Sequence, residues 1–133
     1  CHRQPGQDWT FFEIDPVVEA FSRKGTFTFL NSCAPDARVV LGDARLQLEK
    51  EPPGSFDALA IDAFSSDSIP LHLLTAEAVG VYQRALTPDG ILLIHISNRF
   101  MDLEPVLSAI GRVWRDDYAS ILPYIRWEKI LEL

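Results

Sequence analysis

The sequence lacks three features that would narrow its function at once: a cluster of basic residues, a long apolar run and a glycine-rich motif. It has 12 Lys and Arg residues against 19 Asp and Glu residues, which gives a net charge of −7. Binding to a nucleic acid backbone needs clustered basic side chains that release counterions, so we expect no nucleic acid partner. The apolar runs, such as residues 91–96, are far shorter than the roughly 20 residues that cross a bilayer. We therefore expect no membrane contact by this chain.

Cysteine and histidine are also scarce, with two and three residues respectively. Their spacing matches no zinc pattern, so no metal is expected. The two cysteines, Cys1 and Cys33, form no disulfide framework. This usage indicates a reducing setting, and we expect a cytoplasmic protein.

What is present indicates a single α/β domain spanning residues 1–133. Apolar residues make up 47% of the chain, enough for a buried core. Strand and helix patterns alternate four times, which favours a mostly parallel sheet flanked by helices. A turn is expected at Pro88-Asp89-Gly90. The predicted strands are residues 9–14, 38–41, 56–61 and 91–96, and the predicted helices are residues 17–23, 44–50, 74–86 and 103–114.

Acidic residues stand where each of the first three predicted strands ends. They are Glu13 and Asp15, then Asp43, then Asp62. In open α/β sheets the ligand site lies outside the carboxyl ends of the strands. These acids are therefore expected to form one hydrogen-bonding rim, although an Asp in such a place can also simply cap a helix.

The glycine-rich turn of nucleotide-binding folds has no counterpart here. In those folds an acid that binds ribose follows the turn by about 20 residues, and Glu13 or Asp15 would be that acid. Counting back puts the turn before residue 1, and no G-x-G occurs among the seven glycines. We therefore expect the chain to begin after the first strand of its domain.

Several segments, taken together and in order, resemble the spermidine synthase-like proteins of the class I S-adenosylmethionine-dependent methyltransferase superfamily. The resemblance covers residues 4–107 and implies a Rossmann-like methyltransferase-type sheet, truncated at the N-terminus. The segments are FFEIDP, VVLGDARL, FDALAIDAFSSDSIP, HLLTAEA and LTPDGILLIHISNR.

The resemblance also implies roles for individual residues. Glu13 matches the acid that binds the ribose hydroxyls. Asp43, with Ala44 beside it, matches the acid that binds the adenine amino group. Asp62 matches the first aspartate of the catalytic motif, and Asp67 matches the second.

The function implied is a nucleoside-binding domain that takes S-adenosylmethionine or its decarboxylated form as co-substrate. An aminopropyl group would pass to a small-molecule amine, with Asp62 as general base and Asp67 holding the cationic end of the acceptor. A methyltransferase and a non-catalytic interaction module remain alternatives. The absent first strand would lie in the middle of the sheet, and unpaired strand edges favour self-association, so a homodimer is expected.

Two other side chain types invite a catalytic interpretation. Ser65 and Ser66, with His72 or His95 as base, suggest a hydrolase, but the G-x-S-x-G elbow is missing. His95 lies within the apolar run ILLIHIS, a position more typical of a core histidine than of a catalyst.

Overall fold

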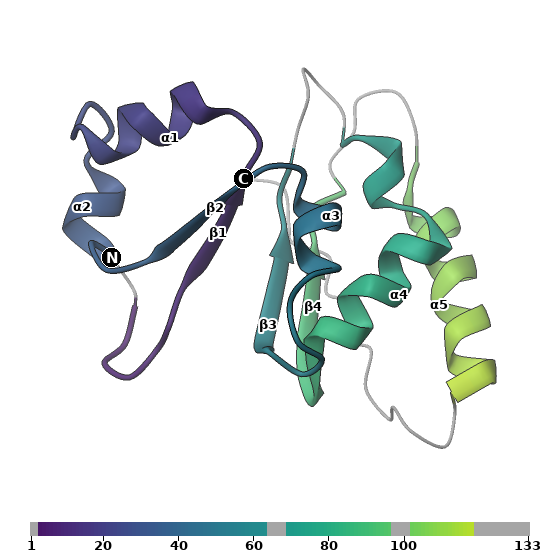
Figure 1. Cartoon of the computed structure of the whole chain (residues 1–133). Helices are drawn as coiled ribbons and strands as arrows, with labels where there is room; N and C mark the ends of the chain where they lie inside the picture. Colours follow the sequence, from purple (N-terminus) through teal and green to yellow (C-terminus); the bar gives the residue numbers. More distant parts are fainter. Residues whose placement is uncertain (1–2, 64–68, 97–101, 119–133) are drawn as a thin grey trace. The chain divides into compact units, whose positions relative to one another are not determined.

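The structure is a computed structural model that describes residues 3–63, 69–96 and 102–118. The chain divides into two compact units, Cys1–Lys50 and Glu51–Leu133, and each is described by itself. Figure 1 labels the helices and strands of both units. Among the described residues, no helix is both long enough and apolar enough to span a membrane.

The Cys1–Lys50 unit is built on two parallel strands, β1 (Thr10–Glu13) and β2 (Arg38–Leu41). The connection between them carries two helices, α1 (Pro16–Arg23) and α2 (Phe29–Cys33). A third helix, α3 (Ala44–Leu48), follows β2 directly. This strand–helix–strand order is the one that the sequence pattern predicted for the first half of the chain.

The core of this unit forms where α2 covers one face of the strand pair. Phe11 and Val39 are partners in the parallel register, so their side chains lie on the same face of the pair. Both pack against a small cluster of buried apolar residues on α2 and in the loop after it. The buried residues of the cluster are Leu30, Ala34 and Ala37.

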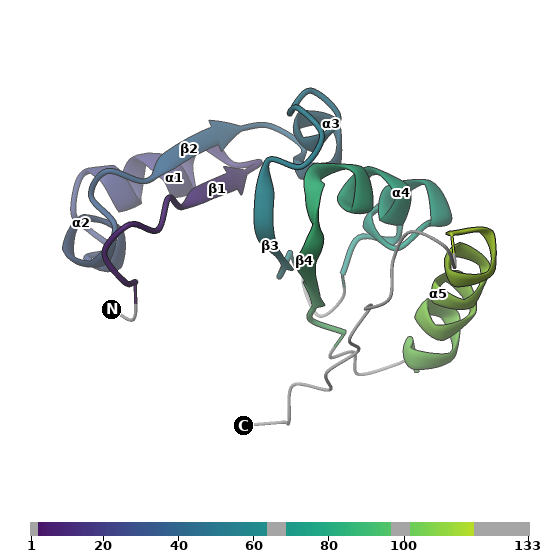
Figure 2. The same ribbon diagram turned by 90° about the horizontal axis from the view of Figure 1, so that it is seen from below.

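The Glu51–Leu133 unit is also built on a pair of parallel strands, β3 (Phe56–Ile61) and β4 (Leu86–Ile94). A short 3-10 helix, η1 (Leu71–Leu73), and α4 (Ala76–Ala85) lie between the two strands in sequence. Figures 1 and 2 show α4 beside β4 and α5 (Glu104–Tyr118) beyond α4, on the same side of the strand pair. The helix α4 has an N-cap, since the side chain of Thr75 accepts a hydrogen bond from the amide of Ala78 at 3.2 Å.

The core of the second unit is centred on Tyr82, one of the largest fully buried side chains. Its hydroxyl donates a hydrogen bond to the carbonyl oxygen of Leu73 at 3.0 Å, so the polar end of the side chain is satisfied in the interior. The apolar residues buried in this unit are Leu59, Ile61, Ile69, Leu73, Leu74, Ala78, Val79, Ala85, Leu86, Leu103 and Leu107.

The turn predicted at Pro88-Asp89-Gly90 lies inside β4, in a stretch that has no regular pairing with β3. Phe56 pairs with Leu86 and Ala58 pairs with Ile91, so a single residue of β3 lies opposite residues 87–90. This irregularity acts as a β-bulge. A Cβ atom on Gly90 would lie 2.9 Å from Cδ2 of Leu86 and 3.0 Å from the carbonyl oxygen of Thr87, so a side chain there would require its neighbours to shift.

The observed architecture is therefore a mixed α/β structure with two short parallel strand pairs, and it is compatible with a Rossmann-like fold. The boundaries of β2 and β3 are as predicted. The helix α2 was not among the predicted helices. At the start of α5, the side chain of Asp102 accepts a hydrogen bond from the amide of Glu104 at 3.1 Å.

Candidate functional site

Two of the predicted nucleoside-binding acids lie together at one edge of the Cys1–Lys50 unit. Glu13 ends β1, and Asp43 follows β2 after one glycine. The two strands are parallel, with Glu13 opposite Leu41. The amide of Gly42 donates a hydrogen bond to the carbonyl oxygen of Glu13 at 2.8 Å. The carboxyl ends of β1 and β2 therefore bring these acids to the same edge, as the sequence predicted for this part of the rim.

Glu13 and Asp15 are both engaged with the start of α1. Glu13 accepts a hydrogen bond from the amide of Asp15 at 2.8 Å. Asp15 accepts one from the amide of Val17, also at 2.8 Å, and is the N-cap of a helix whose first residue is Pro16. The structure thus gives Asp15 a capping role.

Asp43 is likewise an N-cap, here of α3. Its carboxylate accepts a hydrogen bond from the amide of Leu46 at 3.1 Å, and Ala44 is the first residue of the helix. The preceding residue, Gly42, has a φ of 129°, a conformation that side chains other than hydrogen rarely permit. A Cβ atom there would also lie 2.4 Å from Nε2 of Gln47. The turn that presents Asp43 therefore depends on glycine.

The Glu51–Leu133 unit holds a different arrangement at the carboxyl ends of its strands. Nδ1 of His95 lies 2.7 Å from Oδ1 of Asp62, and the two side chains are 41% and 69% exposed. The interpretation of His95 as a buried core histidine is therefore wrong. Within the part of the chain that the structure describes, the Asp62 carboxylate bonds to no backbone amide, so it has no capping role there.

The remaining candidates of the catalytic loop lie outside the described residues. They are Asp67, Ser65 and Ser66. Within residues 3–63, 69–96 and 102–118, no group of three or more His, Cys, Asp or Glu side chains is arranged to hold a metal ion.

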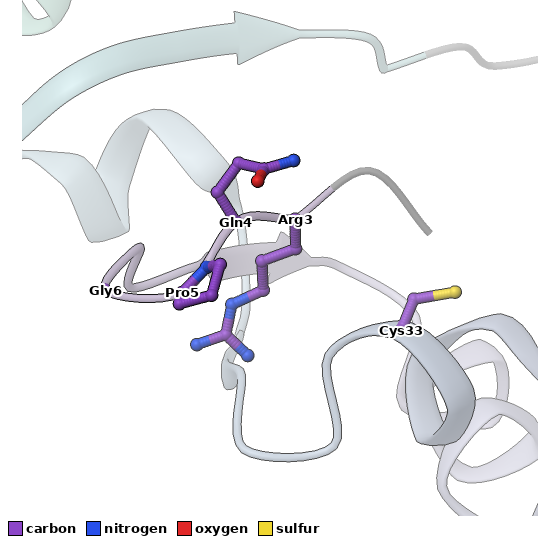
Figure 3. A pocket seen from close by; sticks show the side chains of 5 residues that line it. All are labelled: Arg3, Gln4, Pro5, Gly6 and Cys33. Atoms are coloured by element: carbon purple, nitrogen blue, oxygen red, sulfur yellow. The ribbon is translucent and has the colours of Figure 1, made fainter.

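A hollow of about 320 Å³ lies elsewhere in the first unit, and Figure 3 shows the residues that line it. The lining residues are Arg3, Gln4, Pro5, Gly6 and Cys33. None of the predicted site residues is among them.

Cys33 is disulfide-bonded, which differs from the reducing setting that the cysteine usage indicated.

The positive charge in this hollow is already engaged. Arg3 forms an ion pair with Asp36 and donates hydrogen bonds from Nε and Nη2 to the carbonyl oxygen of Gln7 at 2.9 and 2.6 Å. The hydrogen bond from Arg3 lowers the pKa of the Asp36 carboxyl. Arg3 therefore joins the N-terminal segment to the loop before β2. We place the candidate functional residues at the strand ends of each unit instead.

Comparison with known proteins shows a likeness over part of the chain. No protein-family model matches the chain. A polyamine aminopropyltransferase from Vibrio vulnificus (strain CMCP6) is 30% identical over 91 residues, which cover 67% of this chain and 29% of that protein. The chain therefore matches less than a third of the length of this relative. The likeness supports a relationship to the spermidine synthase-like proteins.

Proposed function

We propose that this chain is the nucleoside-binding part of a spermidine synthase-like aminopropyltransferase, with decarboxylated S-adenosylmethionine as co-substrate and a small-molecule amine as acceptor. The observation that carries the proposal is the exposed Asp62 carboxylate, held by a side chain at the carboxyl end of a parallel strand. The 30% identity with a polyamine aminopropyltransferase supports the same function. The domain would have the Rossmann-like sheet of the methyltransferase type.

In this proposal the nucleoside binds along the edge of the Cys1–Lys50 unit. Glu13 accepts hydrogen bonds from the ribose hydroxyls, and Asp43, beside Ala44, accepts one from the adenine amino group. Carboxylates suit both tasks because they only accept hydrogen bonds. The position of both acids at the carboxyl ends of β1 and β2 supports this assignment. Asp15 contributes by fixing the start of α1.

The chemical step needs a nucleophile and a proton acceptor. The amine nitrogen attacks the carbon bonded to the sulfonium, the new C–N bond forms, and the C–S bond breaks with its electron pair moving to sulfur. Methylthioadenosine leaves as a neutral thioether, and the proton that the nitrogen loses passes to the Asp62 carboxylate as general base. Asp67 would hold a second, cationic group of the acceptor.

A binding and transfer experiment tests this function directly. We expect the protein to bind methylthioadenosine in a calorimetric titration, to prefer decarboxylated S-adenosylmethionine to S-adenosylmethionine, and to transfer its aminopropyl group to an amine. Glu13→Ala should weaken binding. As a matched control, Asp57→Asn changes an acid at the opposite end of β3 and should not.

The alternatives give different results in the same experiment. A preference for S-adenosylmethionine with methyl transfer would replace the proposed reaction. No binding at millimolar ligand would contradict the proposal and favour a non-catalytic interaction module. The expected homodimer stays a prediction, and light scattering at micromolar concentration tests it.

A further inference from the structure

The pairing of His95 with Asp62 assigns a role to a residue that sequence analysis set aside. We propose that His95 is a positioning residue, which holds the Asp62 carboxylate in the orientation that receives the proton of the attacking amine. This inference rests on the proposed aminopropyl transfer. It starts from the 2.7 Å contact between Nδ1 of His95 and Oδ1 of Asp62.

The backbone of the second unit fixes the two side chains next to each other. Ile61 and Ile94 are the last partners in the parallel register of β3 and β4. Asp62 and His95 are the residues that follow, and the amide of His95 donates a hydrogen bond to the carbonyl oxygen of Ile61 at 3.0 Å. Since side chains alternate between the faces of a strand pair, residues that follow a register pair share the next face. Strand pairing therefore brings the two side chains to the same side of the strand pair.

The chemistry of the two groups determines where the hydrogen lies. An ionised carboxylate can only accept a hydrogen bond, so Nδ1 of His95 must carry the hydrogen, in the neutral tautomer as well as in the imidazolium. A donor fixed on Oδ1 restricts rotation of the carboxylate about its terminal bond. One oxygen is thereby held by His95, and the orientation of the carboxylate toward an acceptor amine is set before the substrate arrives.

In this arrangement the Asp62 carboxylate, and not Nδ1 of His95, accepts the proton of the attacking amine. Nδ1 faces the carboxylate and keeps its hydrogen throughout the step. When the C–N bond forms and the C–S bond breaks, the proton of the nitrogen passes to the Asp62 carboxylate. His95 stabilises the carboxylate by donation before the transfer and maintains its geometry during it.

The second unit contains a natural control for this pair. At the other end of the same strands, Oγ1 of Thr87 donates a hydrogen bond to Oδ1 of Asp57 at 3.3 Å. Both pairs join β3 to β4 through an aspartate side chain, but only Asp62 and His95 lie at the carboxyl ends where α/β proteins bind ligands. Loss of the Asp57 pair should therefore leave the transfer rate unchanged.

The kinetic test compares two substitutions of His95 in the protein. His95→Leu removes the donor, whereas His95→Asn places an amide donor near the position of Nδ1. We expect kcat to fall by about 10- to 100-fold in His95→Leu, with the KM for decarboxylated S-adenosylmethionine unchanged and most of the loss recovered in His95→Asn. The control Asp57→Asn should keep the kcat of the original protein. A His95→Leu variant with unchanged kcat would overturn the inference, as would an equal loss in His95→Leu and His95→Asn.

A spectroscopic test separates this inference from the proposed function. Long-range proton–nitrogen NMR of the His95 ring reports which nitrogen carries the hydrogen, without any substrate. We expect the hydrogen on Nδ1 in the original protein and a shift of the tautomer population toward Nε2 in Asp62→Ala. An unchanged population would overturn the pairing. The expected shift in a protein that transfers no aminopropyl group would support the pairing and contradict the proposed function instead.

Discussion

The two units differ in what the acids at their strand ends bond to. Each has a pair of parallel strands, and an acid follows a strand of each pair. In the first unit, Asp15 and Asp43 bond to the amides that begin α1 and α3. In the second unit, Asp62 bonds to the side chain of His95. All three acids stand after a strand, so position alone does not distinguish them. Their hydrogen-bond partners do: Asp15 and Asp43 cap helices, whereas Asp62 caps no described helix.

The largest expected difference between the units is in the effect of losing the Asp62 charge. Asp62→Asn should lower the aminopropyl transfer rate by about 10²- to 10⁴-fold, because the general base is removed. The free energy of unfolding should change by less than about 0.5 kcal/mol, since the side chain is exposed and caps no described helix. Enzyme assays and denaturant unfolding of the same variant check both parts. A loss of unfolding free energy as large as that of a helix-cap variant would contradict the proposed difference between the two units.

Asp43 should show both kinds of effect at once. Asp43→Ala removes the cap of α3 and should cost about 1 kcal/mol of unfolding free energy. It should also weaken binding of methylthioadenosine. Asp43→Asn separates the two effects, because Asn caps helices as well as Asp does but offers its remaining amino group, a donor, to the adenine. We expect nearly full stability and weakened binding in a titration of this variant. Full binding would make Asp43 a cap alone.

Asp15 should affect stability within its own unit. Asp15→Ala removes the hydrogen bond to the amide of Val17 and should cost about 0.5–2 kcal/mol. Native-state hydrogen exchange should show faster exchange in α1 and unchanged exchange in α4, because the two helices belong to different units. Asp15→Asn is the matched control and should restore protection. Equal acceleration in both helices would show that the units unfold together.

The smallest expected effect concerns the pH dependence of the ion pair between Arg3 and Asp36. The hydrogen bond from Arg3 lowers the pKa of Asp36 below its ordinary value of 3.8. A carboxyl with a lowered folded-state pKa stabilises the fold above the unfolded value and loses this contribution as the pH falls through the folded-state value. Asp36→Asn should therefore be slightly less stable than the original protein at neutral pH, and the difference should vanish in acid. The effect is small because the Asp36 side chain is 64% exposed. Denaturant midpoints at both pH values test it.

Much of the local structure follows from short sequence signals. Arg38–Leu41 forms the predicted strand between Pro35 and Gly42, and Phe56–Ile61 forms the predicted strand that begins two residues after Gly54. The helix Phe29–Cys33 was not predicted, because its mixture of aromatic and polar residues favours neither a helix nor a strand strongly. Pro88 and Gly90 give a turn signal, and both lie in the part of β4 between Leu86 and Ile91 that has no regular pairing with β3.

The sequence indicates the individual acids that are candidates for function, but not the side chain that pairs with Asp62. The sequence identified Glu13, Asp43 and Asp62 because acids after strands are visible in a single chain. It could not identify the partner of Asp62, since the register of β3 against β4 depends on pairing between segments more than 20 residues apart. Without the register, His95 appears only as a polar residue in an apolar run.

The bulge in β4 also decides which changes in chain length this site can accept. Residues 87–90 lie opposite a single residue of β3, so one residue more or less in that stretch alters the bulge and leaves the pairing from Ile91 onward in place. A deletion between Ile91 and Ile94 cannot be absorbed by the bulge, because these residues pair regularly with β3. It would move every later side chain to the opposite face and carry His95 away from Asp62. Length variation among relatives of this protein should therefore concentrate in the bulge and be absent from the four residues that follow it.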